Sequence, residues 1–178
     1  MRHIATLAIL AVTALATTAC GVTVSANRLY GGNDLAADVN IEGRWTDDDG
    51  SEVWEFNKEG DSYLAVQVGK DEGEALSIHI VTIGHSRFLD VAPAKTPLLA
   101  IETHFILKMH FEGEELVVEC PDWDWLHDYA VHEGLTQVDL DGSHLLTSPT
   151  PDLQRFFSMY ADDARAWDTD ALRIHRVP

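Results

Sequence analysis

The sequence predicts an α+β fold in which an antiparallel β-barrel, or a strongly curved sheet, is followed by two helices near the C-terminus. Three observations support this fold class. Apolar and polar residues alternate through successive short runs from about residue 41 to 120, which is typical of strands with one buried face. Gly-containing turns separate several of these runs, and two segments with helical periodicity follow. A meander of many strands tends to close into a barrel because closure removes exposed edges.

Each strand is predicted from the face on which its apolar residues fall. The predicted apolar faces are Trp54 and Phe56; Leu64, Val66 and Val68; Leu76, Ile78 and Ile80; and Phe105, Leu107, Met109 and Phe111. Shorter apolar runs at 87–91 and 116–120 indicate two further strands. Asp49-Gly50, Glu59-Gly60 and Glu112-Gly113 stand between runs, where tight hairpins need positive φ.

The last third of the chain predicts two helices, a hairpin and a closing strand. Apolar residues from Trp123 to Ala130 form one helical stripe after Pro121-Asp122, and a second stripe follows Pro151. Asp141-Gly142 is the strongest short hairpin signal in the chain, between strands predicted at 136–139 and 144–147. The final strand is predicted at 172–177.

The first twenty residues have the pattern of an export signal. A short basic start at Arg2 is followed by an apolar run from Ile4 to Ala16, and small residues then lead to Cys20. An apolar run this short indicates a secretory signal rather than a membrane-spanning helix. The segment resembles a bacterial lipoprotein signal, which implies cleavage before Cys20 and diacylglycerol on its sulfur, although Thr17 stands where that family usually has Leu. An ordinary secretory signal is the alternative.

This pattern divides the chain into a signal peptide at 1–19, a flexible tether at 20–40 and one domain at 41–178. The formal net charge of −18 excludes nucleic acid as a default partner and opposes binding to anionic lipid. Acyl chains on Cys20 would therefore provide the membrane anchor. We expect a lipid-anchored, periplasm-facing protein of the bacterial cell envelope. Gly21 favours the outer membrane over the inner, because the inner-membrane retention signal has Asp there.

Gly43-Arg44-Trp45 opens the first predicted strand and resembles the G-x-W start of lipocalins. The resemblance implies that Trp45 plugs the closed end of the barrel beneath an Arg of the last strand. Arg173 and Arg176 are both candidates, and Arg173 is the expected partner. A wider set resembles bacterial lipoproteins with lipocalin-like barrels and implies no activity. That set is Gly43 and Trp45, Ile83-Gly84, Phe88-Leu89-Asp90, His104-Phe105 and Asp124-Trp125-Leu126.

His79 and Trp125 are the candidate residues for binding a ligand or a partner. His79 lies on the face of its strand opposite Leu76 and Ile78, so it is expected either in solvent or in a pocket. Trp125 falls outside the apolar stripe of its helix, so it is expected to cover the barrel mouth or to face a partner.

The histidines do not predict a metal site, and we expect no metal and no cofactor. His104 and His110 share a strand face but are six residues apart, which is about 20 Å. His127 and His132 are five residues apart on a predicted helix and diverge, unlike the i, i+4 pair of a zinc motif. Asp47-Asp48-Asp49 lacks the spacing of a calcium loop and indicates an acidic hairpin tip.

These observations favour a non-enzymatic envelope lipoprotein that binds a small apolar ligand or a partner. Common catalytic motifs such as G-x-S-x-G and the P-loop are absent, and Cys120 is predicted to be a buried, inert thiol. The alternative is a periplasmic inhibitor or immunity protein that blocks a basic lytic enzyme, steered by negative charge. A hydrolase would need polar groups that converge in one cleft. Barrel volume should decide ligand carriage, because aromatic side chains can fill a small lumen.

Overall fold

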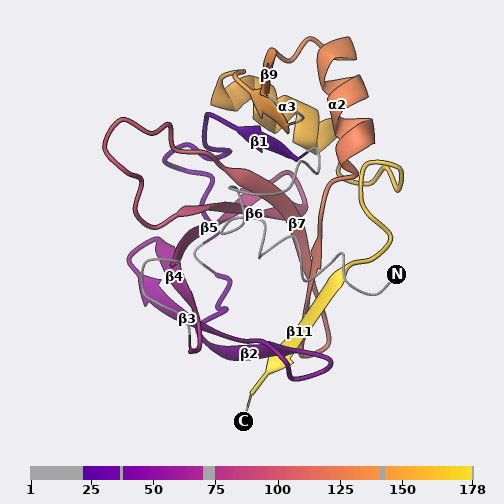
Figure 1. The fold of residues 1–178 in the computed structure, drawn as a ribbon. Coiled ribbons are helices and arrows are strands. Elements are labelled where there is room, and N and C mark those ends of the chain that lie inside the picture. The colour runs from indigo at the N-terminus through magenta and orange to yellow at the C-terminus, as the bar shows by residue number, and fades with distance from the viewer. Residues whose placement is uncertain (1–21, 37, 70–74, 141–142, 178) are drawn as a thin grey trace.

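The computed structural model describes residues 22–36, 38–69, 75–140 and 143–177, and Figure 1 shows their arrangement. Eight strands form a closed antiparallel barrel in the order β11-β2-β3-β4-β5-β6-β7-β8. The strands are β2 Gly43–Asp47, β3 Val53–Glu59, β4 Ser62–Gln67, β5 Leu76–Ile83, β6 Ser86–Pro93, β7 Phe105–Glu112, β8 Glu115–Glu119 and β11 Leu172–Arg176. The predicted α+β fold class with a β-barrel is confirmed.

Alternation along the strands decides which side chains enter the barrel. The inward faces predicted for β3, β5 and β7 carry the barrel core. The face predicted for β4 was wrong, because Tyr63 and Ala65 point inward and Leu64 and Val66 point outward. Both parities of this strand are apolar, so periodicity alone could not choose. Tyr63 belongs inside because its hydroxyl donates to the Val39 carbonyl at 2.9 Å.

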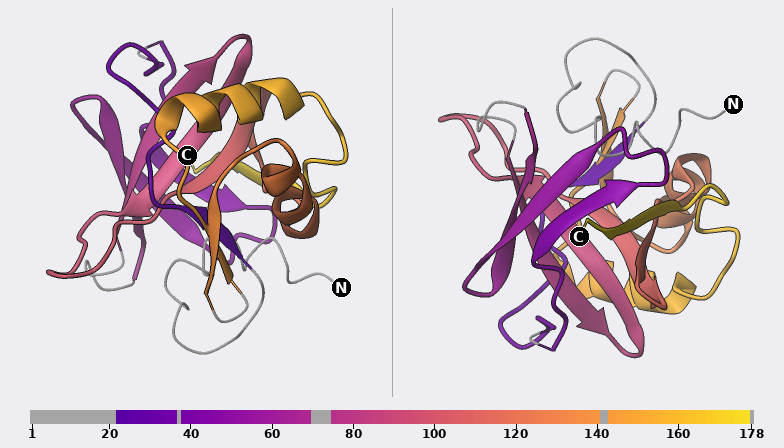
Figure 2. Two further views of the ribbon diagram at one scale, coloured as in Figure 1. Left: turned by 90° about the horizontal axis from the view of Figure 1, so that it is seen from above. Right: turned by 90° about the horizontal axis from the view of Figure 1, so that it is seen from below.

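A second layer covers one outer face of the barrel. It contains a three-stranded sheet in the order β1-β10-β9. Its elements are β1 Thr23–Ser25, β9 Gln137–Leu140, β10 Ser143–Leu146 and the helices α2 Trp123–His132 and α3 Thr150–Tyr160. Figures 1 and 2 show these elements gathered beside β6 and β7. The predicted helices and the two paired strands of the predicted hairpin are therefore present, whereas its Asp141-Gly142 turn lies outside the described residues. The hairpin strands pair outside the barrel, which keeps its eight-stranded order.

The two layers enclose a second apolar core. Val81, Phe88 and Ile106 point out of the barrel yet are almost completely buried, because the helices pack on them. Their partners from the outer layer include Leu126, Ala130, Leu153, Phe156, Phe157 and Trp167. Strands β5, β6 and β7 thus bury apolar side chains on both faces, as expected of strands covered on both sides.

The tether predicted at 20–40 was wrong for the residues that the structure describes. Thr23–Ser25 pairs in parallel with β10, and Leu29 and Ile41 are fully buried. This segment lacks periodicity because its partners, such as β10, are distant in sequence. Cys20 and the signal segment 1–19 lie outside the described residues, as does Gly21.

Candidate functional site

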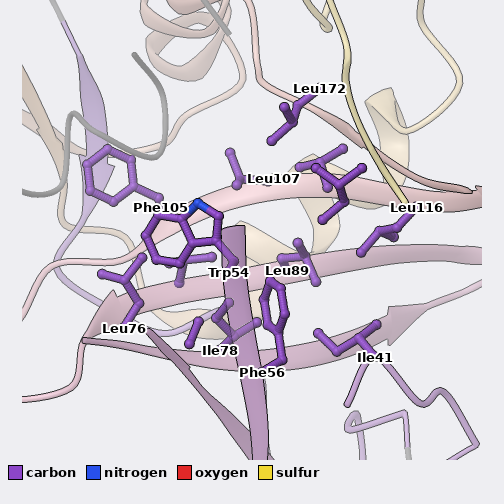
Figure 3. Close-up of a pocket in the computed structure, with 14 residues that line it drawn as sticks. Ile41, Trp54, Phe56, Leu76, Ile78, Leu89, Phe105, Leu107, Leu116 and Leu172 are labelled. Atoms are coloured by element: carbon purple, nitrogen blue, oxygen red, sulfur yellow. The ribbon is translucent and has the colours of Figure 1, made fainter. Parts of the chain in front are cut away.

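The barrel lumen is the first candidate site, and it is apolar throughout. It contains a cavity of about 40 Å³. The lining residues are Ile41, Trp54, Phe56, Ala65, Leu76, Ile78, Leu89, Val91, Phe105, Leu107, Leu116, Val118, Leu172 and Ile174. Figure 3 shows Trp54 and Phe56 of β3 lying among the aliphatic side chains of the other strands.

This cavity is far smaller than a typical ligand pocket. Pockets for small molecules have volumes of about 300–1,000 Å³, and a single water needs only about 10–15 Å³. Trp54, Phe56 and Phe105 occupy the lumen as the sequence suggested. Phe111 does not; it is 38% exposed and its ring lies 6.5 Å from that of Trp45 at the closed end. An apolar ligand could therefore enter only if these side chains moved.

Trp45 closes one end of the barrel, but its partner is Arg176 and not Arg173. The guanidinium carbon of Arg176 lies 4.6 Å from the centre of the Trp45 ring, and its nitrogens donate to the carbonyls of Glu42 and Asn40. Arg176 is directly opposite Trp45 in the β11–β2 pair, so the two side chains share a face. Alternation places Arg173 on the outer face.

On the outer face, Arg173 forms ion pairs instead of a plug. Its guanidinium lies 2.7 Å from the Glu112 carboxylate and 3.3 Å from that of Glu115. The predicted pair of Trp45 with Arg173 is therefore wrong, and the reason is strand parity. Counting from Ile174, which faces the lumen, would have assigned Arg176 to the inner face.

A polar cluster lies between the barrel and the covering segment. Asp90 is 1% exposed, and its carboxylate accepts the Leu29 N–H and lies 2.6 Å from Nδ1 of His104. Nε2 of the same imidazole lies 3.3 Å from the Glu102 carboxylate. Buried carboxylates need such partners because an unpaired charge in this environment is costly. The cluster ties the N-terminal segment to β6 and β7.

His79, a predicted binding residue, lies at the edge of this cluster. It is directly opposite Asp90 in the β5–β6 pair. Its ring stacks on that of Tyr30, with the centroids 4.3 Å apart, and the Tyr30 hydroxyl lies 3.1 Å from its Nε2. Burial holds the pKa of His79 below its usual value, against the opposing charge of Asp90. His79 is half-buried and already paired, so little of it is available to a ligand.

Trp125, the other predicted binding residue, is part of an aromatic cluster in the outer layer. Its ring stacks on Tyr129 at 4.6 Å and meets Tyr160 edge-on at 4.9 Å. It packs against the second core and neither covers the barrel mouth nor stands free. Its indole nitrogen is buried without a hydrogen-bond partner among the described residues.

Cys120 has the environment of an unreactive thiol. Burial, with a smaller contribution from the negative charge of Asp168, raises its pKa to about 11. Almost no thiolate exists at neutral pH under these conditions, and the thiolate is the reactive form.

The acidic hairpin tip at Asp47 also has a structural role, because the Asp47 carboxylate accepts hydrogen bonds from Ser51 and from the Glu52 N–H.

The tertiary structure brings together histidines that sequence spacing did not pair. His127 of α2 stacks on His144 of β10 with ring centroids 3.8 Å apart. Asp139 of β9 lies 2.8 Å from Nδ1 of His144. The pairs considered from the sequence were His104 with His110 and His127 with His132. The only sequence signal for the observed cluster was the hairpin itself, which places Asp139 opposite His144.

The loop between β6 and β7 exposes large apolar side chains. Leu98, Leu99 and Ile101 are 94%, 98% and 68% exposed. Leu99 has φ of 77°, a conformation that normally requires Gly. The Ala100 N–H donates to the Pro97 carbonyl at 3.0 Å, so a tight turn presents the two leucines to solvent. Periodicity does not detect such a loop.

Comparison with known proteins adds no identity to this geometry. No protein-family model, curated protein or solved structure matches the chain. Within the described residues, none of the helices is both long and apolar enough to span a bilayer.

Proposed function

We propose that this chain is a non-enzymatic lipoprotein of the bacterial cell envelope that acts as a partner-binding module. The observation that carries the choice between ligand and partner is the volume of the lumen, about 40 Å³. A barrel holds a ligand only when its side chains leave room. The lipocalin-like barrel is in this proposal a rigid support for surface loops.

The Leu98–Leu99 turn is the proposed contact surface. Contiguous exposed apolar side chains are typical of interaction sites, and Leu98 and Leu99 are almost fully exposed. Leu99 also keeps a strained backbone conformation, and such strain is concentrated at functional positions. Glu102 is exposed beside the turn, which fits a partner with an apolar recess and basic groups around it.

The second candidate function is inhibition of a basic lytic enzyme in the periplasm, or immunity to one. It is favoured by the shape of the same loop, which extends away from the barrel between β6 and β7 (Figure 1). A projecting apolar tip suits a cleft better than a flat surface. The net charge of −18 would accelerate encounter with a basic enzyme.

Localisation and binding are tested separately. Wild-type protein should fractionate with membranes and carry an acylated Cys20, whereas Cys20→Ser should become soluble or remain uncleaved. An unmodified N-terminus beyond residue 20 would contradict the anchor.

For ligand carriage, a fluorescent apolar probe is titrated against the purified protein. Saturable binding that Phe105→Trp weakens would assign the lumen, not the loop, as the site.

Partner binding is tested with a photo-crosslinking residue at position 99 and, as a matched control, at Val138, an exposed apolar residue in the outer sheet. One envelope protein should crosslink from position 99 and not from 138. Capture should fall in Leu98→Ser and at raised salt. Equal crosslinking from both positions, or capture indifferent to Leu98→Ser, would overturn the proposed surface.

A further inference from the structure

We propose that His127, Asp139 and His144 form a binding site for a divalent transition-metal ion of the zinc type. One ligand atom from each residue lies within 4.8 Å of those of the other two. The residues come from three elements, α2, β9 and β10. The site is independent of the lumen and of the Leu98–Leu99 turn.

The hairpin and the helix place these groups by two separate constraints. Asp139 and His144 are directly opposite in the β9–β10 pair, which puts both side chains on one face. Gln137 shares that face, and its amide lies 2.9 Å from Nδ1 of His127. The oxygen of the same amide is buried without a hydrogen-bond partner among the described residues. If the amide is turned over, this oxygen accepts the Nδ1–H of His127. Nε2 then carries no proton and is the nitrogen that would bind a metal.

The donor set suits zinc and similar ions. Two imidazoles and one carboxylate are common ligands of catalytic and regulatory zinc, with water completing a tetrahedron. Bonds of about 2.0–2.2 Å separate neighbouring ligand atoms by roughly 3.4 Å, and the ligand atoms of these residues lie within 4.8 Å of one another. Closing the site requires a small shift of these atoms and a turn of the stacked imidazole rings, so that their in-plane lone pairs point at the ion. Asp139 can make such a shift, because its side chain is 75% exposed.

The contact between Gln137 and His127 separates this cluster from ordinary surface pairs. His110 lies 3.2 Å from Glu112, and His85 lies 3.1 Å from Asp162. Each of those pairs offers one imidazole and one carboxylate, without a second imidazole stacked on the first. Ligating histidines characteristically donate their other ring N–H to a fixed partner, and the Gln137 side chain lies beside Nδ1 of His127, where it can be that partner.

A bound ion would fasten α2 to the outer sheet. His144 is also tied to the N-terminal segment, because its backbone N–H donates to the Val22 carbonyl at 2.9 Å. The metal would therefore stabilise the junction of α2, the hairpin and β1. Binding to the folded state alone raises apparent stability with metal concentration.

The test uses the full-length chain in detergent without a polyhistidine tag. Zn²⁺ is titrated by calorimetry, and Co²⁺ is added separately because its visible spectrum reports the ligand geometry. We expect one Zn²⁺ per chain with a Kd below about 10 µM, a rise in Tm with Zn²⁺, and a tetrahedral Co²⁺ spectrum. His127→Gln and His144→Gln should each weaken binding about a hundredfold or more. Gln137→Leu should weaken it about tenfold.

His110→Gln is the matched control, because it removes an exposed histidine of a one-imidazole pair, and it should leave Zn²⁺ affinity unchanged. Asp139→Asn keeps the test independent of folding, since this exposed side chain can be changed without disturbing a core. Wild-type protein that binds no Zn²⁺ at 100 times the expected Kd would overturn the site. Equal losses in His110→Gln and His144→Gln would do the same, because they would show scattered surface binding.

Discussion

Nδ1 of His104 lies 2.6 Å from Oδ1 of Asp90, with both side chains almost completely buried between the barrel and its outer layer. The same carboxylate accepts the N–H of Leu29. His104 and Ser25 also exchange two backbone hydrogen bonds, at 2.8 and 2.9 Å. The N-terminal segment is therefore held to the barrel by a buried polar contact as well as by apolar packing.

Asp90→Asn should lower the free energy of unfolding by about 3–5 kcal/mol, because breaking one side of a buried pair leaves its partners unsatisfied. Urea denaturation measures the loss. His110→Gln, in an exposed pair of a histidine with a carboxylate, should change little. Hydrogen exchange should also show that the Leu29 amide loses protection before the barrel strands do. An unchanged Leu29 amide would contradict the role of Asp90 as a clamp.

Arg176→Ala should lower the free energy of unfolding by about 1–2 kcal/mol, since it removes the cation–π contact with Trp45 and two hydrogen bonds to carbonyls. Arg173→Ala is the matched control on the same strand and should have a smaller effect, because its ion pairs are exposed and screened. The two variants are compared by urea denaturation at low and high salt. Only the Arg173 effect should shrink with salt, and the reverse ranking would contradict the assignment of Arg176 as the plug.

Leu99→Gly should raise the free energy of unfolding by up to about 1 kcal/mol, because Gly adopts the observed φ of 77° without steric cost. Leu98→Gly, at a neighbour without positive φ, should instead lower it by about 0.5–1 kcal/mol. Thermal and urea denaturation measure both changes. If Leu99→Gly also reduces partner capture, the strained leucine is retained for binding and not for stability. A destabilising Leu99→Gly would show that the turn does not hold this conformation.

His79 should make the protein less stable as the pH falls below about 6.5. Its folded-state pKa lies below the usual value, mainly through burial, whereas the unfolded chain has the usual pKa of about 6.5. The unfolded state therefore binds the proton first, and the stability present above pH 6.5 is lost as the pH falls through the folded-state pKa. Asp90, His104 and Arg28 also face this ring.

The measurement is the difference in Tm between wild type and His79→Gln across pH 5 to 8. This difference cancels the titration of the surface carboxylates, which both proteins share. The pH-dependent loss should be shallower in the variant. Parallel curves would show that His79 titrates identically in the folded and unfolded chains.

Much of the barrel could be predicted from the sequence because its determinants are local. Alternation in β3, β5 and β7 gave the correct inward faces, and Gly-containing turns marked the hairpins. The same alternation would have chosen Arg176 over Arg173 as the partner of Trp45. It failed on β4, where Leu64 and Val66 are as apolar as the residues that face inward.

The candidate sites were harder to predict because they depend on contacts distant in sequence. His79 and Trp125 were chosen for lying off the apolar face of their elements. Tyr30 of the N-terminal segment covers His79, and Tyr129 and Tyr160 pack on Trp125 within the outer layer, so both positions are occupied by aromatic neighbours. The exposed turn at Leu98–Leu99 carries no periodic signal, and only the conformation of Leu99 distinguishes it.

The sequence by itself determined the helices, the acidic charge and the inward faces of β3, β5 and β7, because hydrophobic periodicity and composition act within a few residues. The tertiary structure alone decided that the lumen is nearly full, that residues 22–36 fold against the barrel and its outer layer, and that His127 meets His144. Each of these depends on how two apolar layers pack around one sheet. Packing of that kind depends on volumes and registers of elements far apart in the chain, which no local pattern records.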